Sequence, residues 1–180
     1  YTLPWYGETM PTGLKQSSSV VSIGFEAVET AANTFTQSSI DLNLSPLDRE
    51  VFVVLAVNLD PATPDLTGGV DSFVSTSLCT TSQTAVQNLS NTNCLAVSAN
   101  VIRSDAAAPT AVAQFQTLGL ETPPANLDYV GIIATNDFFV QIKGTGNTAA
   151  KGIRGKMYGY RATANADIFA ALVQSEVLSA

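Results

Sequence analysis

The chain is dominated by short segments in which apolar and polar residues alternate, which is the pattern of half-buried β-strands. Residues 20–27 are the first clear example, with Val21, Ile23 and Phe25 on one face and polar or small residues between them. The segment Val51–Val57 differs because it is continuously apolar and rich in β-branched residues. That composition predicts a central strand covered on both faces.

Further segments of the same kind are separated by stretches rich in Gly, Pro and Ala, and residues 58–69 in particular are expected to form a loop. Eight or nine short strands with turn signals between them predict an all-β fold, either a β-sandwich or a barrel. We expect more than about a third of the residues to lie in strands. The additional strand segments are residues 35–44, 70–78, 95–103, 112–118, 129–135, 138–143 and 153–161.

The two ends of the chain follow other patterns. Residues 1–19 have no sustained period and are expected to form an N-terminal arm, or a first strand followed by a loop, ahead of one domain over 20–180. Residues 164–178 place apolar side chains at helical spacing, with Asn165 or Asp167 as N-cap. We expect this short C-terminal helix to close its own domain in preference to packing on another subunit.

Composition narrows the class of protein. Only 13% of the 180 residues are charged, whereas 46% are hydrophobic, and an average soluble domain has roughly 25% charged residues. This balance favours a β-rich protein that buries much of its surface against neighbours, or a secreted module. The chain contains no histidine, so it lacks the imidazole that most acid–base and triad chemistry uses. Carboxylate, lysine or serine chemistry remains open, as in a hydrolase, but the sequence shows no pair of acidic residues that marks such a site. We expect no enzymatic activity, no cofactor and no small-molecule substrate.

Charge is strongly segregated along the chain. Five of the eight basic residues lie within residues 143–161, which contain no Asp or Glu, although the net charge is −7. Two alternating runs flank a turn-rich loop here, which predicts a basic β-hairpin on an acidic body. Its partner could be another copy, nucleic acid or an anionic membrane, and we favour the acidic surface of a neighbouring copy. The residues of this predicted assembly patch are Lys143, Lys151, Arg154, Lys156 and Arg161.

The last predicted strand also interleaves basic and aromatic residues. Strand geometry places Arg154, Lys156, Tyr158 and Tyr160 on one face. Single-stranded nucleic-acid platforms use such an arrangement. Ion pairing between copies explains the same pattern, and five cations make a modest footprint for nucleic acid. We therefore prefer the contact between copies.

Cys79 and Cys94 enclose a loop rich in Ser, Thr and Asn. Two cysteines in a polar loop suit a disulfide better than a metal site, which needs more ligands. A bridge would contribute roughly 3 kcal/mol in the chain-entropy model. The pattern leaves two alternatives open, a disulfide between Cys79 and Cys94 or two unpaired thiols.

One loop offers carboxylates at short spacing. Residues 58–65 include Asp60 and Asp65 together with several carbonyl groups, which could hold Ca²⁺. The loop lacks the glycine and the terminal glutamate of an EF-hand. We therefore expect a solvated loop and no metal site.

These features together resemble the single jelly-roll coat proteins of icosahedral viruses. The resemblance rests on the irregular arm, about eight strands, the apolar strand Val51–Val57, the late strand pair within Phe138–Arg161 and the low charge. It implies a jelly-roll-like β-sandwich that acts as a structural virion protein. Such a capsid subunit builds an icosahedral shell by symmetric self-association, with other copies and other capsid proteins as its partners.

A second hypothesis belongs to the class of binding proteins. An extracellular or cell-surface β-sandwich could recognise a carbohydrate or a receptor through aromatic side chains. The stacking candidates would be Trp5, Tyr6, Tyr158 and Tyr160. Because sandwich folds serve both roles, the fold class alone does not choose between them.

Overall fold

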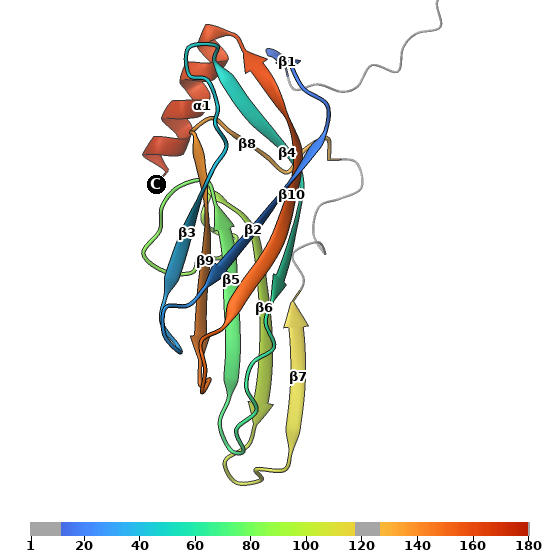
Figure 1. Cartoon of the computed structure of the whole chain (residues 1–180), viewed down its shortest axis with the longest axis vertical. Helices are drawn as coiled ribbons and strands as arrows, with labels where there is room; N and C mark the ends of the chain where they lie inside the picture. The colour runs from blue at the N-terminus through green and yellow to red at the C-terminus, as the bar shows by residue number, and fades with distance from the viewer. Residues whose placement is uncertain (1–11, 118–126, 180) are drawn as a thin grey trace, which may run out of the picture.

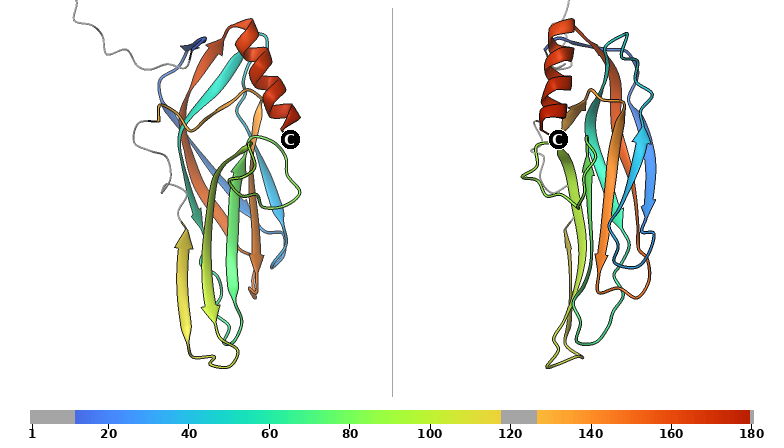
Figure 2. Two further views of the ribbon diagram at one scale, coloured as in Figure 1. Left: turned by 180° about the vertical axis from the view of Figure 1, so that it is seen from behind. Right: turned by 90° about the vertical axis from the view of Figure 1, so that its left-hand side faces the viewer.

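The chain folds into two five-stranded antiparallel sheets packed face to face, with one helix at one end (Figure 1). A computed structural model describes residues 12–117 and 127–179. Strands contain 51% of the described residues and the helix contains 8%. These fractions confirm the prediction of a mostly β fold with a short C-terminal helix. Figure 2 shows the two layers from the side, with the helix beside one end of the sandwich.

The first sheet, called sheet A here, is built around its longest strand, β10. On one side β10 pairs with β4, which pairs in turn with the three-residue β8. On its other side β10 pairs with β1 and β2, which lie end to end along it. The strands are β1 (Leu14–Gln16), β2 (Val21–Val28), β4 (Glu50–Pro61), β8 (Gly131–Ile133) and β10 (Gly152–Ala164).

The second sheet, sheet B, has the order β3-β9-β5-β6-β7. All neighbouring strands in it are antiparallel. Strand β7 forms one edge and extends beyond sheet A at the lower end of the molecule in Figure 1. The strands are β3 (Thr36–Asp41), β5 (Ser72–Cys79), β6 (Cys94–Ser104), β7 (Val112–Thr117) and β9 (Asp137–Thr145).

Each segment predicted as a strand contains a strand in the structure. The structure differs from the prediction at the end of β4 and adds detail to the N-terminal segment. Strand β4 continues to Pro61, so the prediction of a loop from Asn58 onwards is wrong for its first four residues. Leu59 and Pro61 are buried, and they continue the inward alternation that begins at Val57. Strand β1 lies within residues 1–19, the segment predicted as an arm or a first strand plus loop, and residues 1–11 are outside the described part.

The predicted basic β-hairpin does not form. Strands β9 and β10 are consecutive in sequence, but β9 lies in sheet B and β10 in sheet A. Residues 146–151 therefore cross from one layer to the other. The glycines and polar residues there signal a reversal of the chain, but they do not determine whether the returning strand pairs with the preceding one.

The main core lies between the two sheets. Phe25 of β2 and Phe138 of β9 meet across it edge to face, with ring centroids 5.7 Å apart and an interplanar angle of 77°. This geometry is favourable for aromatic pairs. The other fully buried apolar side chains of this core are Phe52, Val54, Val74, Leu78, Ile133, Val140, Ile142, Ile153 and Met157.

Strand β4 also serves a second core on the outer face of sheet A. Tyr158 of β10 pairs with Ala56 but the next residue, Gly159, pairs with Val54, so Leu55 is an extra residue on β4. Such a β-bulge shifts the alternation by one residue. Val51 and Val53 consequently belong to the second core, and every residue from Val51 to Val54 is fully buried. This confirms the expected strand with both faces covered.

The helix α1 (Ala166–Leu178) covers this second core. Asn165 is its N-cap, and the Asn165 side-chain oxygen accepts a hydrogen bond of 2.9 Å from the backbone N–H of Ile168. One face of the helix packs on the apolar side chains of β1, β4 and β10, so the helix closes its own domain as expected. The packed residues are Ile168, Phe169, Leu172 and Val173.

The C-terminal part of α1 is anchored by a buried carboxylate. Glu176 accepts hydrogen bonds from the backbone N–H groups of Ala134 (3.3 Å) and Thr135 (2.9 Å). The Asn93 side chain donates to the carbonyl oxygen of Glu176 at 3.1 Å. Burial raises the pKa of Glu176 above its usual range. The helix is thus tied to the two connections that precede β6 and β9.

Gly159 allows the close approach of β10 to β4, which yields a test of the packing. A Cβ atom at this position would overlap the carbonyl oxygen of Val53 and lie 2.6 Å from the Phe52 ring. We expect Gly159→Ala to lower the free energy of unfolding by about 1–3 kcal/mol or more, because a fully packed core cannot yield. The measurement is equilibrium denaturation in urea.

Gly24→Ala is the matched control, since a Cβ atom at Gly24 of β2 would meet nothing within 4 Å. That change should alter stability by less than about 0.5 kcal/mol. Equal effects of the two substitutions would contradict the β4–β10 packing described above.

Candidate assembly surfaces

The five basic residues predicted to form one patch are distributed over three environments. Arg154 and Lys156 lie on the outer face of sheet A, because Ile153 and Met157, which flank them in β10, point into the main core. Lys143 lies on the outer face of sheet B, on the opposite side of the sandwich. The remaining two, Lys151 and Arg161, form intramolecular ion pairs.

Arg154 is largely exposed although it has acidic neighbours. Its Nε atom is 3.5 Å from Glu26 Oε1, and the Arg154 side chain is 79% exposed. An ion pair this exposed contributes roughly 0–1 kcal/mol. Asp60 lies opposite Arg154 on β4, and a hollow of about 440 Å³ beside these residues is lined by both carboxylates. The Arg154 guanidinium is therefore accessible to a partner, which would have to replace only the weak ion pair with Glu26.

Lys156 lies on the same face, one pair further along the strand. Its neighbours across the sheet are Gly24 on β2 and Asn58 on β4, so no carboxylate stands directly beside it. Because Gly24 has no side chain, the lysine is not shielded from that side. Lys156 is thus the most available cation of the outer face.

The predicted aromatic positions of β10 separate into an exposed and a buried one. Tyr158 is 37% exposed next to Lys156, whereas Tyr160 is only 8% exposed and belongs to the core under α1. The shared strand face is confirmed, but helix α1 covers its upper half. The prediction that Tyr160 is a stacking residue is therefore wrong. The other two candidates, Trp5 and Tyr6, lie outside the described residues.

Lys151 is used within the fold. Its Nζ atom is 2.6 Å from Asp65 Oδ1, and its side chain is only 14% exposed. Asp65 also accepts hydrogen bonds from Thr148 and from the backbone N–H of Ala149. The hydrogen bond from Lys151 holds the pKa of Asp65 well below its usual range.

The loop considered for Ca²⁺ does not bring its carboxylates together. Asp65 is occupied by Lys151, while Asp60 points outward from β4 beside Arg154. Across residues 12–117 and 127–179, no group of three or more acidic or sulfur side chains is arranged to hold a metal ion.

A buried carboxylate that the sequence did not reveal stands next to this ion pair. Glu29 is 3% exposed and accepts three backbone hydrogen bonds of 2.9 Å, from Thr34, Gly144 and Lys151. It joins the β2–β3 connection to β9 and to the β9–β10 connection. The partners are up to 122 positions away in sequence, so no local pattern could have signalled them.

Asn33 and Asn147 extend the same polar network. The Asn33 amide donates to the carbonyl oxygen of Asn147, and the backbone N–H of Asn147 donates to the Asn33 side chain, both at 2.9 Å. The Asn147 side chain also accepts from the backbone N–H of Asp65 and donates to the carbonyl of Phe73. Three connections at one end of the sandwich are thereby fixed to one another.

Arg161 performs a similar role at the other end. It lies at 2.7 Å from Glu50 Oε1 and donates to the carbonyl oxygens of Leu42 (2.6 Å) and Asn43 (3.2 Å). Its side chain thus fixes the β3–β4 connection against β4. Arg161 is committed to the fold and cannot be counted as a surface cation.

Cys79 and Cys94 are brought directly together. They are cross-strand partners at the joined ends of β5 and β6, and both are buried as free thiols. The hydrogen bond with Cys94, together with burial, raises the pKa of Cys79 well above its ordinary value. The spacing that suggested a bridge therefore reflects real proximity.

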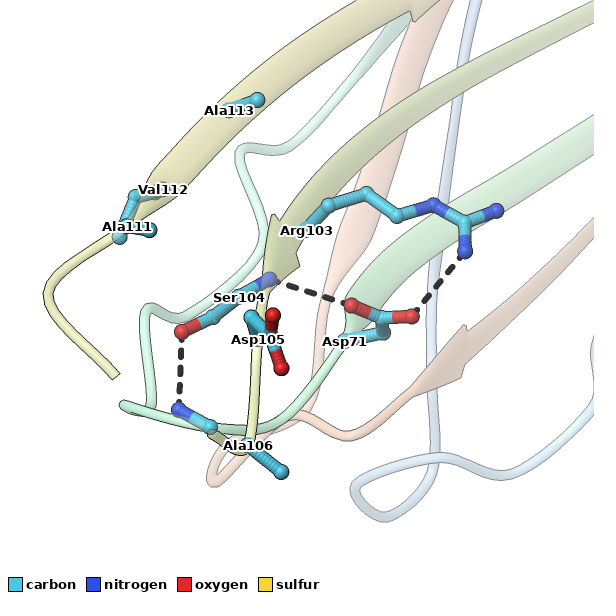
Figure 3. Close-up of a pocket in the computed structure, with 9 residues that line it drawn as sticks. Asp71, Arg103, Ser104, Asp105, Ala106, Ala111, Val112 and Ala113 are labelled. Atoms are coloured by element: carbon cyan, nitrogen blue, oxygen red, sulfur yellow. Dashed lines mark hydrogen bonds and ion pairs between the residues drawn. The ribbon is translucent and has the colours of Figure 1, made fainter. Parts of the chain in front are cut away.

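A second hollow, of about 600 Å³, lies where β6 turns into β7 (Figure 3). Asp71 accepts hydrogen bonds of 3.1 Å from the Arg103 guanidinium and from the backbone N–H of Ser104. Both oxygens of the Asp71 carboxylate are engaged, and Asp105, which accepts a hydrogen bond from the backbone N–H of Ala107, also lines the hollow. Ala111 and Val112 complete the rim at the start of β7.

Comparisons with known proteins give little guidance. No family model matches the chain, and no curated protein matches it. Among solved structures, one titled desmodium yellow mottle tymovirus is similar, with 13% identity over 84% of this chain and 92% of that chain, at a TM-score of 0.29. A TM-score of this size does not establish a shared fold. No helix in the described residues is long and apolar enough to cross a membrane.

The Lys151–Asp65 pair yields a prediction about pH. Because the pKa of Asp65 is depressed in the folded state, its stabilisation is present above the usual carboxyl pKa near 3.8 and is lost as pH falls towards the folded value. We expect Asp65→Asn to lower the melting temperature at neutral pH, with a gap that narrows below about pH 4. Asp48→Asn, in the exposed β3–β4 connection, should show no such gap. A gap independent of pH would contradict the ionic origin.

The paired cysteines yield a second prediction. If the protein works outside a reducing compartment, Cys79 and Cys94 should be bridged in the native protein. A thiol reagent applied after denaturation without reductant should then modify neither cysteine, as read by mass spectrometry. Modification of both would show that the cysteines remain thiols. In the bridged case, Cys79→Ser should lower stability by roughly 3 kcal/mol.

Proposed function

We propose that this chain is a structural virion protein, a capsid subunit that builds an icosahedral shell by symmetric self-association and carries no enzymatic activity. The strand order supports the proposal. Strands β2, β10, β4 and β8 stand against β3, β9, β5 and β6. Two four-stranded sheets connected by two Greek keys are the plan of a jelly roll, a fold that viral capsid proteins use repeatedly.

The connections favour the same topology. Strands β2, β3, β4 and β5 alternate between the sheets, and so do β8, β9 and β10. Strands β1 and β7 are additions, one extending the β2 edge of sheet A and the other widening sheet B beyond β6. We propose that the fold is a jelly-roll sandwich to which β1 and the edge strand β7 are added.

The observation that carries the self-association is the exposure of two cations on the outer face of sheet A. Arg154 and Lys156 stay exposed although the protein has an excess of seven negative charges and uses Lys151 and Arg161 inside the fold. Identical copies arranged by symmetry can place such cations against each other's acidic surface. The weakly similar tymovirus structure is compatible with a virion role, and the proposal does not depend on it.

A pair of carboxylates that could receive these cations lies on the outer face of sheet B. Asp41 of β3 lies directly opposite Asp137 of β9. Like charges at directly opposite positions repel each other, so a cation from another copy would relieve that repulsion. We propose that contacts between Arg154 or Lys156 and these carboxylates contribute to the shell.

The competing function is an extracellular module that binds carbohydrate or a receptor. Its support is the exposed Tyr158 beside Lys156, an aromatic and basic pair on one open face. Such a module would remain a monomer in solution, whereas a shell protein forms large closed particles. Particle size by light scattering and electron microscopy therefore separates the two functions.

A double variant tests the electrostatic contact. Arg154→Glu combined with Lys156→Glu should impair particle assembly while the domain stays folded. We expect a stability loss of about 1–2 kcal/mol at most, because a carboxylate at position 154 would lie directly opposite Glu26 and Asp60. Raising the salt concentration should weaken wild-type assembly in the same way, since the Debye length falls from roughly 10 Å at 0.1 M to 3 Å at 1 M. The readout is sedimentation velocity.

Lys143→Glu, on the opposite face of the sandwich, is the matched control. It changes the net charge in the same direction but should leave assembly intact. Normal assembly of the double variant would refute the contact. Normal assembly with lost binding to nucleic acid or anionic vesicles would assign Arg154 and Lys156 to that partner.

A further inference from the structure

Strand β7 is an edge strand without the usual protection. All six residues, Val112–Thr117, are exposed, and the strand pairs only with β6. Its sequence contains no charge and no proline, and its register with β6 runs without a bulge. Natural proteins normally use such devices to prevent an edge from pairing with another chain.

The other edges of the two sheets are protected. In β3, Gln37 is hydrogen bonded to Ser82 and Gln83 of the β5–β6 connection, and the strand ends at Asp41. In sheet A, the edge strands β1 and β8 have only three residues each, and the edge strand β2 carries the charged Glu26 on its exposed face. An unprotected edge of six residues is therefore a particular property of β7 within the described part of the chain.

Both faces of β7 are suited to pairing. Phe115 is 59% exposed and lies in a cross-strand row with Val101 of β6 and Phe73 of β5 on the outer face of sheet B. Gln114 and Gln116 lie on the other face, and sheet A does not extend over them (Figure 1). One face is thus apolar, and the other carries amides that can both donate and accept hydrogen bonds.

The local charge indicates which partner fits. Among the charged side chains beside β7, Arg103 and Asp71 neutralise each other at 3.1 Å, and Asp105 of the β6–β7 connection adds one negative charge. Two copies that each carry a net charge of −7 repel each other at most approaches. The β7 edge itself carries no charged residue, so two copies that pair along it bring no like charges directly opposite each other. A second copy of the same chain is therefore an occupant that this edge can accept.

We propose that β7 pairs antiparallel with β7 of a second copy about a two-fold axis, joining two copies of sheet B into one continuous sheet. A two-fold axis perpendicular to the sheet keeps outer faces together, so each residue must meet one of the same face. Centring the axis on Phe115 places the two Phe115 rings side by side and each Gln114 opposite Gln116. This β7–β7 pairing would be one of the contacts of the proposed self-association, but it can form whether or not the copies build a closed shell.

Sedimentation equilibrium of the full chain tests the dimer. The wild-type protein should show a monomer–dimer equilibrium, and Phe115→Lys should weaken it about tenfold or more, because two lysines would then face each other. Leu47→Lys, at a residue 95% exposed in the β3–β4 connection, should leave it unchanged. A strictly monomeric wild type, or equal dimerisation of Phe115→Lys, would overturn the proposal.

Cross-linking tests the register. Directly opposite residues in an antiparallel pair have Cα atoms about 4.5–5.5 Å apart, which suits a disulfide. Under mild oxidation Phe115→Cys should form a covalent dimer, whereas Gln114→Cys should not. The reverse result would refute the pairing centred on Phe115. A wild-type dimer without larger particles would support the β7 contact and count against the closed shell. Closed particles formed by Phe115→Lys would support the shell and count against the β7 contact.

Discussion

The pairing of β10 with β4 is the interaction on which the rest of the structure depends. β10 carries β1 and β2 on its other edge, so the whole of sheet A is assembled on it. The extra residue Leu55 shifts the alternation of β4 halfway along this ladder. One half of β4 can therefore contribute to the main core while also supporting the core under α1. The close contact at Gly159 allows both functions within one strand pair.

Most of the polar interactions that fix the sandwich lie at its two ends. Glu29 and the Lys151–Asp65 pair join three connections at one end, while Arg161 and Glu176 hold the connections at the other. These groups are buried or half-buried and their donors and acceptors are largely matched, as buried polar groups require. The outer faces carry exposed charges of both signs, such as Arg154 and Glu26 on sheet A, beside uncharged stretches such as β7. Contacts between copies on those faces can accordingly be neutral or of opposite charge.

The strands and the helix could be predicted from the sequence because they depend on local alternation and capping. The continuous apolar run of Val51–Val57 correctly indicated a strand covered on both faces, and Asn165 was one of the two residues predicted as N-cap. The pairing of strands was less accessible. Residues 146–151 signal a reversal whether the chain stays in one sheet or crosses to the other. The roles of Lys151 and Arg161 could not be foreseen for a related reason, since their acidic partners lie 86 and 111 positions away.

The place of β9 and β10 in the two sheets has a consequence for the order of folding. β9 lies between β3 and β5 in sheet B, and β10 lies between β2 and β4 in sheet A. Both central strands therefore emerge from the ribosome after all the strands with which they pair. Until they emerge, β1, β2 and β3 have no sheet partner, and β4 and β5 each lack one of their two neighbours. The loop-closure entropy of these distant contacts makes folding slow. A nascent or truncated chain exposes unpaired edges in both layers, and a chaperone or a fellow subunit that shields those edges would raise the yield of the native protein.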